Sequence, residues 1–128
     1  MKSSAPAVAI VDDQSIMRDV ARSFLLNNGY EVSLEAVNGV DLLAQLESVK
    51  KLPDICLLDL NMPGMDGFET ARNLRSRFPS IRILAFSLAA AKAQVEDILE
   101  CGADGFLPKE AGLDRWRKEL AGVAHPNQ

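Results

Sequence analysis

The fold of this chain is indicated most clearly by residues 54–67, which read DICLLDLNMPGMDG. A short and almost unbroken apolar run is typical of a strand buried on both faces, and such strands lie at the centre of parallel sheets. The run ends at Asp59, and a turn-forming segment with one proline and two glycines follows it. Because ligands of open parallel sheets bind at the carboxyl ends of the strands, we expect Asp59 to lie at the functional edge.

Length and composition narrow the class of protein. The 128 residues suffice for one domain, and 48% apolar with 25% charged residues is an ordinary globular balance. The formal net charge of −4 argues against direct binding to nucleic acid or to an anionic membrane. The first residues contain no apolar signal segment, and no apolar run is long enough to span a membrane. We interpret Cys56 and Cys101 as buried free thiols and expect a cytoplasmic location.

Apolar periodicity predicts five strands that alternate with five helices. The strands are expected at residues 7–11, 30–36, 54–59, 81–86 and 105–107. The helices are expected at 15–26, after Asn38-Gly39 as far as Val49, at 66–78, at 88–100 and at 111–123. This alternation predicts a doubly wound parallel sheet with helices on both faces, which is a three-layer α/β/α fold with right-handed crossovers.

The apolar positions also predict which helix faces point inward. In the first helix the spacing of Ile16, Val20 and Phe24 predicts the buried face. The same reasoning assigns to the core Val95, Ile98 and Leu99 in the fourth helix, and Leu113, Trp116, Leu120 and Val123 in the fifth.

Five polar side chains follow the predicted strands and should meet at one edge of the sheet. They are Asp12, Asp13, Asp59, Ser87 and Lys109. Three neighbouring carboxylates repel one another unless a cation compensates, and Mg²⁺ favours a site with one or two carboxylates plus phosphate oxygens. A carboxylate can act as a nucleophile and carry an aspartyl phosphate. Phosphoryl transfer needs mainly positioning and charge neutralisation, which a metal, an ammonium and a hydroxyl can supply.

These motifs resemble those of the receiver domain of two-component response regulators over about residues 7–124. The matching segments are VDD at 11–13, LLDLNMPGMDG at 57–67, FS at 86–87 and GADGFLPK at 102–109. The resemblance implies a flavodoxin-like, five-stranded parallel sheet with strand order 2-1-3-4-5 and five helices. Residues 1–6 and 125–128 are then expected to be short flexible tails.

The resemblance also implies a chemical role for the acidic residues. Asp59 would accept a phosphoryl group from the phosphohistidine of a sensor histidine kinase or a phosphotransfer protein. Mg²⁺ is expected to bind Asp13, Asp59 and the backbone carbonyl of Asn61, with Asp12 acting mainly through water and by placing the metal. The domain would be a signalling phosphoacceptor and not an enzyme in the usual sense, since it would catalyse only its own phosphorylation and dephosphorylation.

The remaining implied roles concern the response to phosphorylation. Lys109 would pair with Asp59 and then with the phosphoryl oxygens, Ser87 would turn toward the phosphoryl group, and Phe106 would follow inward as the switch residue. The family's output face comprises the fourth helix, fifth strand and fifth helix, and it would control dimerisation or partner binding. Its expected exposed positions are Lys92, Gln94, Glu96, Asp97, Arg115 and Arg117.

The chain departs from the common family pattern near two site residues. Glu110 stands where many receivers have a proline after the lysine, so we expect a trans Lys109–Glu110 bond. Leu88 replaces a small residue beside Ser87 and is expected to narrow access to Asp59. The segment FLPKEA is more similar to receivers joined to helix-turn-helix DNA-binding domains, which favours a role in transcription regulation. A stand-alone receiver and a part of a longer regulator both fit the sequence.

Several alternatives remain open at this point. The acidic pair and Ser87 could cap helices, because Asp and Ser are common N-cap residues, and Phe106 could be an ordinary core residue. The whole domain could be a phosphorylation-independent interaction module. A phosphatase of the haloacid-dehalogenase type is a weaker alternative, because its second aspartate would lie two positions after the first-strand nucleophile, where this chain has Gln14.

Overall fold

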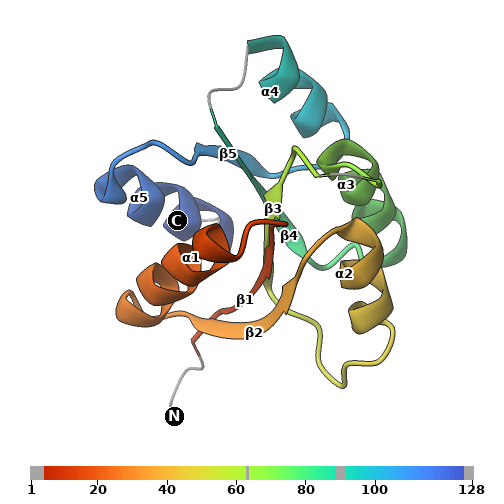
Figure 1. Cartoon of the computed structure of the whole chain (residues 1–128), viewed down its shortest axis with the longest axis horizontal. Helices are drawn as coiled ribbons and strands as arrows, with labels where there is room; N and C mark the ends of the chain where they lie inside the picture. The colour runs from red at the N-terminus through yellow and green to blue at the C-terminus, as the bar shows by residue number, and fades with distance from the viewer. Residues whose placement is uncertain (1–4, 63, 89–91, 126–128) are drawn as a thin grey trace.

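The computed structural model describes residues 5–62, 64–88 and 92–125 and contains one five-stranded sheet between two layers of helices (Figure 1). The strands are β1 (Ala7–Val11), β2 (Glu31–Ala36), β3 (Ile55–Asp59), β4 (Arg82–Ser87) and β5 (Gly105–Pro108). The helices are α1 (Ser15–Asn27), α2 (Gly39–Leu46), α3 (Gly67–Arg77), α4 (Lys92–Glu100) and α5 (Leu113–Ala124). The expectation of flexible tails falls mainly on residues 1–4 and 126–128, which lie outside the described residues.

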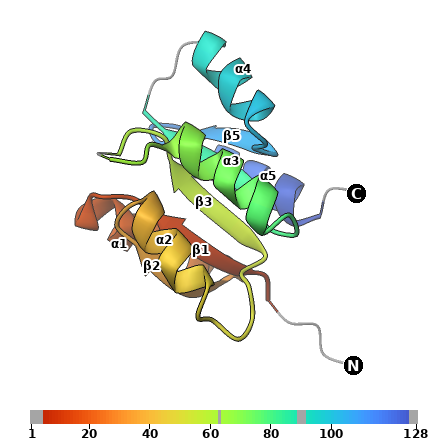
Figure 2. The same cartoon turned by 90° about the vertical axis from the view of Figure 1, so that its right-hand side faces the viewer.

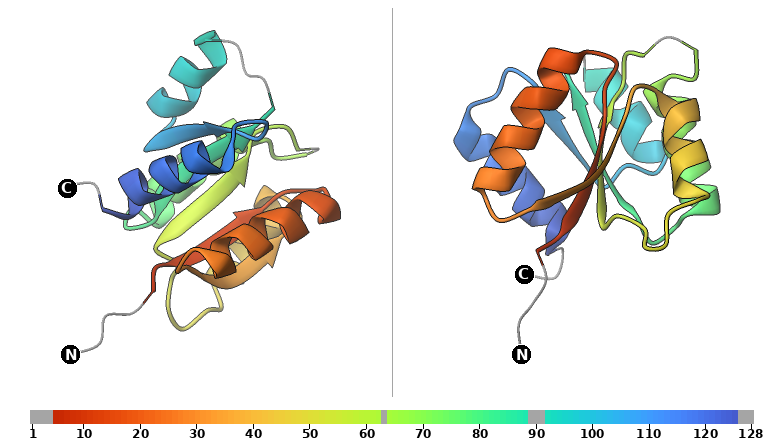
Figure 3. Two further views of the ribbon diagram at one scale, coloured as in Figure 1. Left: turned by 90° about the vertical axis from the view of Figure 1, so that its left-hand side faces the viewer. Right: turned by 60° about the horizontal axis from the view of Figure 1, so that its bottom comes forward.

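The sheet has the strand order β2-β1-β3-β4-β5, and neighbouring strands pair in parallel. Helices α2, α3 and α4 lie on one face of it (Figure 2), and α1 and α5 cover the other (Figure 3). The predicted doubly wound architecture is therefore confirmed. Every residue of β3 is buried, as expected for the central strand of a parallel sheet.

Each face of the sheet has its own hydrophobic core. Along β1, Ala9 and Val11 belong to the core under α2, α3 and α4, whereas Val8 and Ile10 belong to the core under α1 and α5. This division follows from the alternation of side chains along a strand. Among the described residues, no helix combines the length and the apolar character needed to cross a membrane.

Three aromatic rings organise the core beneath α1 and α5. Trp116 on α5 packs edge-to-face against Phe24 on α1, with ring centroids 5.2 Å apart, and against Phe86 on β4, with centroids 5.1 Å apart. Such pairs contribute about 0.5–1.5 kcal/mol beyond the burial of their area. The rings therefore tie both helices of this layer to the centre of the sheet.

The turn after β3 brings the start of α3 close to the loop that follows Asp59. The side chain of Asp66 caps α3 by accepting a hydrogen bond from the backbone N–H of Glu69 at 2.9 Å. A Cβ on Gly67 would lie 2.5 Å from Leu60 Cα and 2.7 Å from the Asp59 backbone oxygen. Position 67 therefore requires glycine, because the backbone of the loop leaves no room for a side chain.

The predicted inward face of α1 is wrong in two of its three positions. The side chains of Ile16 and Val20 are 75% and 46% exposed, whereas Phe24 is buried as predicted. The helix buries Ala21 and Leu25 beside Phe24. The apolar residues of α1 form two overlapping stripes that are offset by one residue. The sheet contacts the stripe with Ala21 and Leu25, and the stripe with Ile16 and Val20 is exposed.

Other differences from the sequence predictions are smaller. Leu113 and Leu99 are 54% and 44% exposed instead of buried, and Cys101 is only half-buried. Leu113 is the first residue of α5, and the buried residues of this helix begin at Trp116. Some boundaries shift: β2 and β4 each begin one residue later, α2 ends at Leu46 and α5 begins at Leu113. The predicted start of α4 includes residues 89–91, which lie outside the described residues.

Candidate functional site

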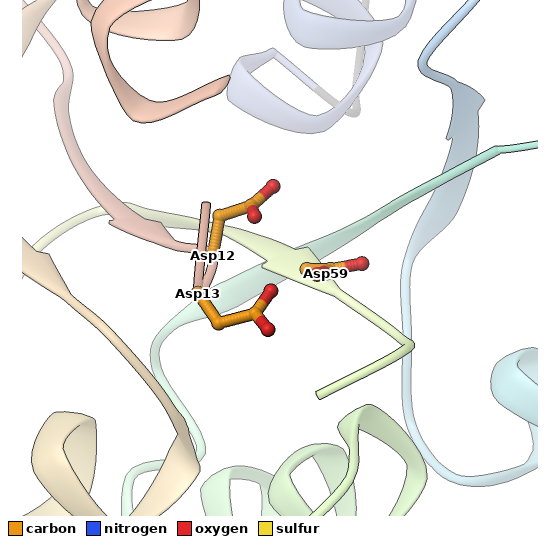
Figure 4. Close-up of side chains that lie close together, drawn as sticks. All are labelled: Asp12, Asp13 and Asp59. Carbon is orange, nitrogen blue, oxygen red and sulfur yellow. The ribbon is translucent and has the colours of Figure 1, made fainter. Parts of the chain in front are cut away.

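Three aspartates gather where β1 and β3 end (Figure 4). One carboxylate oxygen from each of Asp12, Asp13 and Asp59 lies within 4.8 Å of the others. The backbone N–H of Asp12 donates to Ala36 O at 3.1 Å, and Asp12 Oδ1 accepts from the N–H of Gln14 at 2.9 Å. Asp12 and Asp59 are buried and Asp13 is exposed, so the cluster has a buried floor and an open side.

Lys109 brings an ammonium group into the same cluster. Its backbone N–H donates to Ser87 O at 2.8 Å, which fixes the end of β5 beside the end of β4. Its Nζ atom lies 2.7 Å from Asp12 Oδ2 and 3.5 Å from Asp59 Oδ1. The ammonium therefore contacts both carboxylates, although it lies closer to Asp12 than to Asp59, the partner expected from the sequence. The Lys109–Glu110 peptide bond is trans.

The environment of Asp59 favours its protonated form. Burial raises the pKa of this carboxyl to about 6, with Asp12 adding to the rise, while Lys109 and the backbone N–H of Asn61 oppose it. At neutral pH the carboxylate is therefore mostly ionised, although its surroundings disfavour the negative charge. An added cation would stabilise this ionised form.

Asn61 connects Asp59 to Ser87. The backbone N–H of Asn61 donates to Asp59 Oδ1 at 3.2 Å, and its side-chain Nδ2 donates to Ser87 Oγ at 3.0 Å. The Ser87 hydroxyl donates in turn to Leu88 O at 3.4 Å. Sequence reasoning missed the side-chain contact between Asn61 and Ser87, because it considered only the backbone carbonyl of Asn61.

A cavity of about 130 Å³ opens above Asp59. Its lining residues are Asp13, Gln14, Asp59, Asn61, Leu88 and Lys109. Leu88 is 61% exposed and stands at the rim, in agreement with the expectation that it narrows access to Asp59. The cavity provides room for a small ligand directly in contact with the carboxylate.

The residues at this site fit a hard divalent cation. Among the described residues, three carboxylates gather beside the Lys109 ammonium, and oxygen donors are the ligands that Mg²⁺ prefers. Asp12 Oδ2 is buried, and within the described part of the chain it has only the ion-pair contact with Lys109 and no well-aligned hydrogen bond. The cluster therefore retains oxygen lone pairs and negative charge that a cation would neutralise.

The structure also gives the burial of Phe106 and of the residues predicted to form an output face. Phe106 on β5 is half-buried and packs against the core under α2, α3 and α4, so its alternative role as an ordinary core residue stays open. The positions expected to be exposed on the output face are all exposed: Lys92, Gln94, Glu96, Asp97, Arg115 and Arg117.

The fold and the site together define a doubly wound α/β domain with an acidic pocket at the carboxyl edge of its sheet. A family model described as the response regulator receiver domain matches residues 8–121, and the chain belongs to this family. It is therefore a phosphoacceptor domain of two-component signalling. The match also disfavours the alternative of a haloacid-dehalogenase-type phosphatase.

Relatives of two kinds match the chain. It is 37% identical to the transcriptional activator protein ExaE of Pseudomonas putida, over 94% of this chain and 58% of that protein. It is 34% identical to the chemotaxis protein CheY of Listeria monocytogenes, over 90% of this chain and 95% of that protein. The signal receiver domain of a NarL response regulator from Mycobacterium tuberculosis superposes with a TM-score of 0.87 at 31% identity, covering 98% of this chain and all of that one. The chain thus spans just over half of ExaE and nearly all of CheY.

Proposed function

We propose that Asp59 is the phosphoacceptor and that it receives its phosphoryl group from the phosphohistidine of a sensor histidine kinase or phosphotransfer protein. An Asp59 carboxylate oxygen attacks phosphorus, the P–N bond breaks, and the imidazole leaves with the electron pair and takes up a proton. The observation that supports this role is the position of Asp59, which lies at the end of the central strand, inside the cavity and beside Lys109. No other described carboxylate combines these three features.

Asp13, Asp59 and the backbone carbonyl of Asn61 are proposed to hold Mg²⁺, with Asp12 acting through water and by placing the metal. The ion would neutralise charge on the phosphoryl oxygens as they approach the carboxylates. Asp13 is exposed and the cavity reaches it, so an ion could enter from solvent. Lys109 already contacts two carboxylates and is proposed to shift toward the phosphoryl oxygens when Asp59 is modified.

Ser87 and Phe106 are proposed to pass the modification on to the output face. The Ser87 hydroxyl is buried and is bonded to Asn61, so a turn toward the phosphoryl group exchanges one partner for another. Phosphorylation adds about −1.5 to −2 charges and shifts a pre-existing equilibrium on the α4-β5-α5 face. The readout is a homodimer or control of an output domain, and the resemblance to ExaE favours transcription regulation.

Mass spectrometry after incubation with acetyl phosphate and Mg²⁺ tests the central step. The wild-type protein should gain one phosphoryl group, and Asp59→Asn should gain none. Asp97→Asn removes an exposed carboxylate on α4 and serves as the matched control, which should be phosphorylated like the wild type. An Asp59→Asn protein that still gains the group, or a wild type that never does, would refute the assignment. A wild type that is never phosphorylated would support the phosphorylation-independent alternative.

A further inference from the structure

Arg18 on α1 contacts the main chain of the acidic loop and is not among the residues that line the cavity. Its Nη1 atom donates to the backbone oxygen of Asp12 at 2.7 Å, and its side chain is only 18% exposed. This bond reaches across six positions in sequence, from the second turn of α1 back to the residue that follows β1. It is a charge-assisted bond to a main-chain carbonyl, which makes it stronger than a neutral one.

The bond to Arg18 is one of four contacts of Asp12 that fix the loop carrying Asp12 and Asp13. The N-cap residue of α1 is Gln14, and within the described residues its side chain forms no capping bond. Asp12 is instead held through four of its own atoms. Its N–H bonds to Ala36, its Oδ1 to Gln14, its Oδ2 contacts Lys109, and its carbonyl oxygen accepts from Arg18.

The guanidinium is itself held in place from the neighbouring strand. Arg18 Nε lies 3.6 Å from Glu35 Oε1 on β2, and Arg22 Nη1 lies 2.6 Å from Glu35 Oε2. The backbone oxygen of Glu35 accepts a hydrogen bond from Gln45 Nε2 at 2.9 Å. The planar guanidinium can contact Glu35 with one nitrogen while another bonds the Asp12 carbonyl, which a single ammonium cannot do in the same geometry.

We propose that Arg18 is a positioning residue for the metal site. It holds the Asp12–Asp13 loop so that both carboxylates face Asp59, and it leaves their charges available because it bonds a carbonyl and not a carboxylate. Groups that orient metal ligands commonly change metal affinity about 10–100-fold when they are removed. The inference deepens the proposed function and rests on it.

The test compares two arginines that share one partner. Arg18→Met removes the donors and keeps an apolar stem, while Arg22→Met removes the closer partner of Glu35, one turn along the same helix. Mg²⁺ binding is measured by isothermal titration calorimetry at pH 7.5. We expect the Kd of Arg18→Met to rise about tenfold and that of Arg22→Met to stay within about twofold of the wild type. Phosphorylation of Arg18→Met by acetyl phosphate should be slow at low Mg²⁺ and recover at saturating Mg²⁺, because positioning acts through metal affinity.

Each remaining outcome has a defined meaning. Arg18→Met binding Mg²⁺ within twofold of the wild type overturns the proposal, and so does an equal loss in Arg22→Met, since that would implicate Glu35 pairing and not the carbonyl bond. If Arg18→Met does not fold, Arg18→Lys replaces it and should bind Mg²⁺ a few-fold more weakly than the wild type; wild-type affinity there overturns the proposal. A wild type that neither binds Mg²⁺ nor becomes phosphorylated contradicts the proposed function itself.

Discussion

Replacing Asp59 with asparagine should stabilise the metal-free protein at neutral pH, although we also expect it to prevent phosphorylation. Burial and the Asp12 carboxylate raise the pKa of Asp59 from 3.8 to about 6. The shift of about two pH units, at about 1.4 kcal/mol each, means that ionised Asp59 lowers the free energy of unfolding by up to about 3 kcal/mol. Because the cavity exposes Asp59 to solvent screening, we expect Asp59→Asn to gain only about 2 kcal/mol. Asparagine has the same shape and still accepts the N–H of Asn61.

The sign of the pH dependence follows from the raised pKa. The folded state binds the Asp59 proton more tightly than the unfolded state, so the stability gained by protonation is lost as pH rises from about 4 to about 6. The advantage of Asp59→Asn should therefore be full at pH 7.5 and fall to about a third of that value at pH 4.5. Urea unfolding followed by circular dichroism, with EDTA present, measures both values.

A control and a metal titration make this experiment decisive. Asp97→Asn removes an exposed carboxylate and should change the free energy of unfolding by less than about 0.5 kcal/mol at either pH. Mg²⁺ should stabilise the wild type and leave Asp59→Asn nearly unchanged, since binding to the folded state alone raises stability. The reasoning fails if Asp59→Asn is no more stable than the wild type at pH 7.5, or if its advantage does not depend on pH.

Three further outcomes are expected. Gly67→Ala should lower the free energy of unfolding by about 3 kcal/mol in chemical denaturation, because its Cβ would lie 2.5 Å from Leu60 Cα. A decrease of less than about 1 kcal/mol would show that the loop moves to make room for the methyl group. Leu88→Ala should shorten the half-life of the phosphorylated protein a few-fold, since Leu88 lines the cavity over Asp59, and a longer half-life would contradict the shielding role. At limiting Mg²⁺, the rate of phosphorylation by acetyl phosphate should fall about tenfold per pH unit below about pH 6, because protonated Asp59 is not a nucleophile; a flat profile down to pH 5 would contradict this.

The order of strands and the gathering of site residues could be predicted because each acidic or basic group directly follows an apolar strand. Parallel strands place their carboxyl ends on one edge, so Asp12, Asp13, Asp59, Ser87 and Lys109 had to converge there. The family resemblance then supplied the strand order and the chemistry, and the match over residues 8–121 agrees with both.

The sequence could not predict which of two nearly equivalent arrangements a helix face or a side chain adopts. The apolar residues of α1 fit two faces one residue apart, and only contact with the sheet selects Ala21 over Val20. The preference of Lys109 for Asp12 and the bond from Asn61 to Ser87 depend on side-chain rotamers, which a sequence pattern does not specify. The periodicity of apolar residues does not predict the bond from Arg18 to the Asp12 carbonyl, because this bond joins a helix to a loop through a single atom.

The edge-to-face rings that pack between the sheet and helices α1 and α5 have a practical consequence for studying this domain. The chain contains one tryptophan, and Trp116 touches the Phe86 ring, over which the Lys109 ammonium lies 5.4 Å from the centroid. A displacement of that ammonium alters the electric field on the indole through one intervening ring. The intrinsic fluorescence of Trp116 should therefore change when Mg²⁺ binds or when the site is phosphorylated, so both events can be followed in real time without an added label.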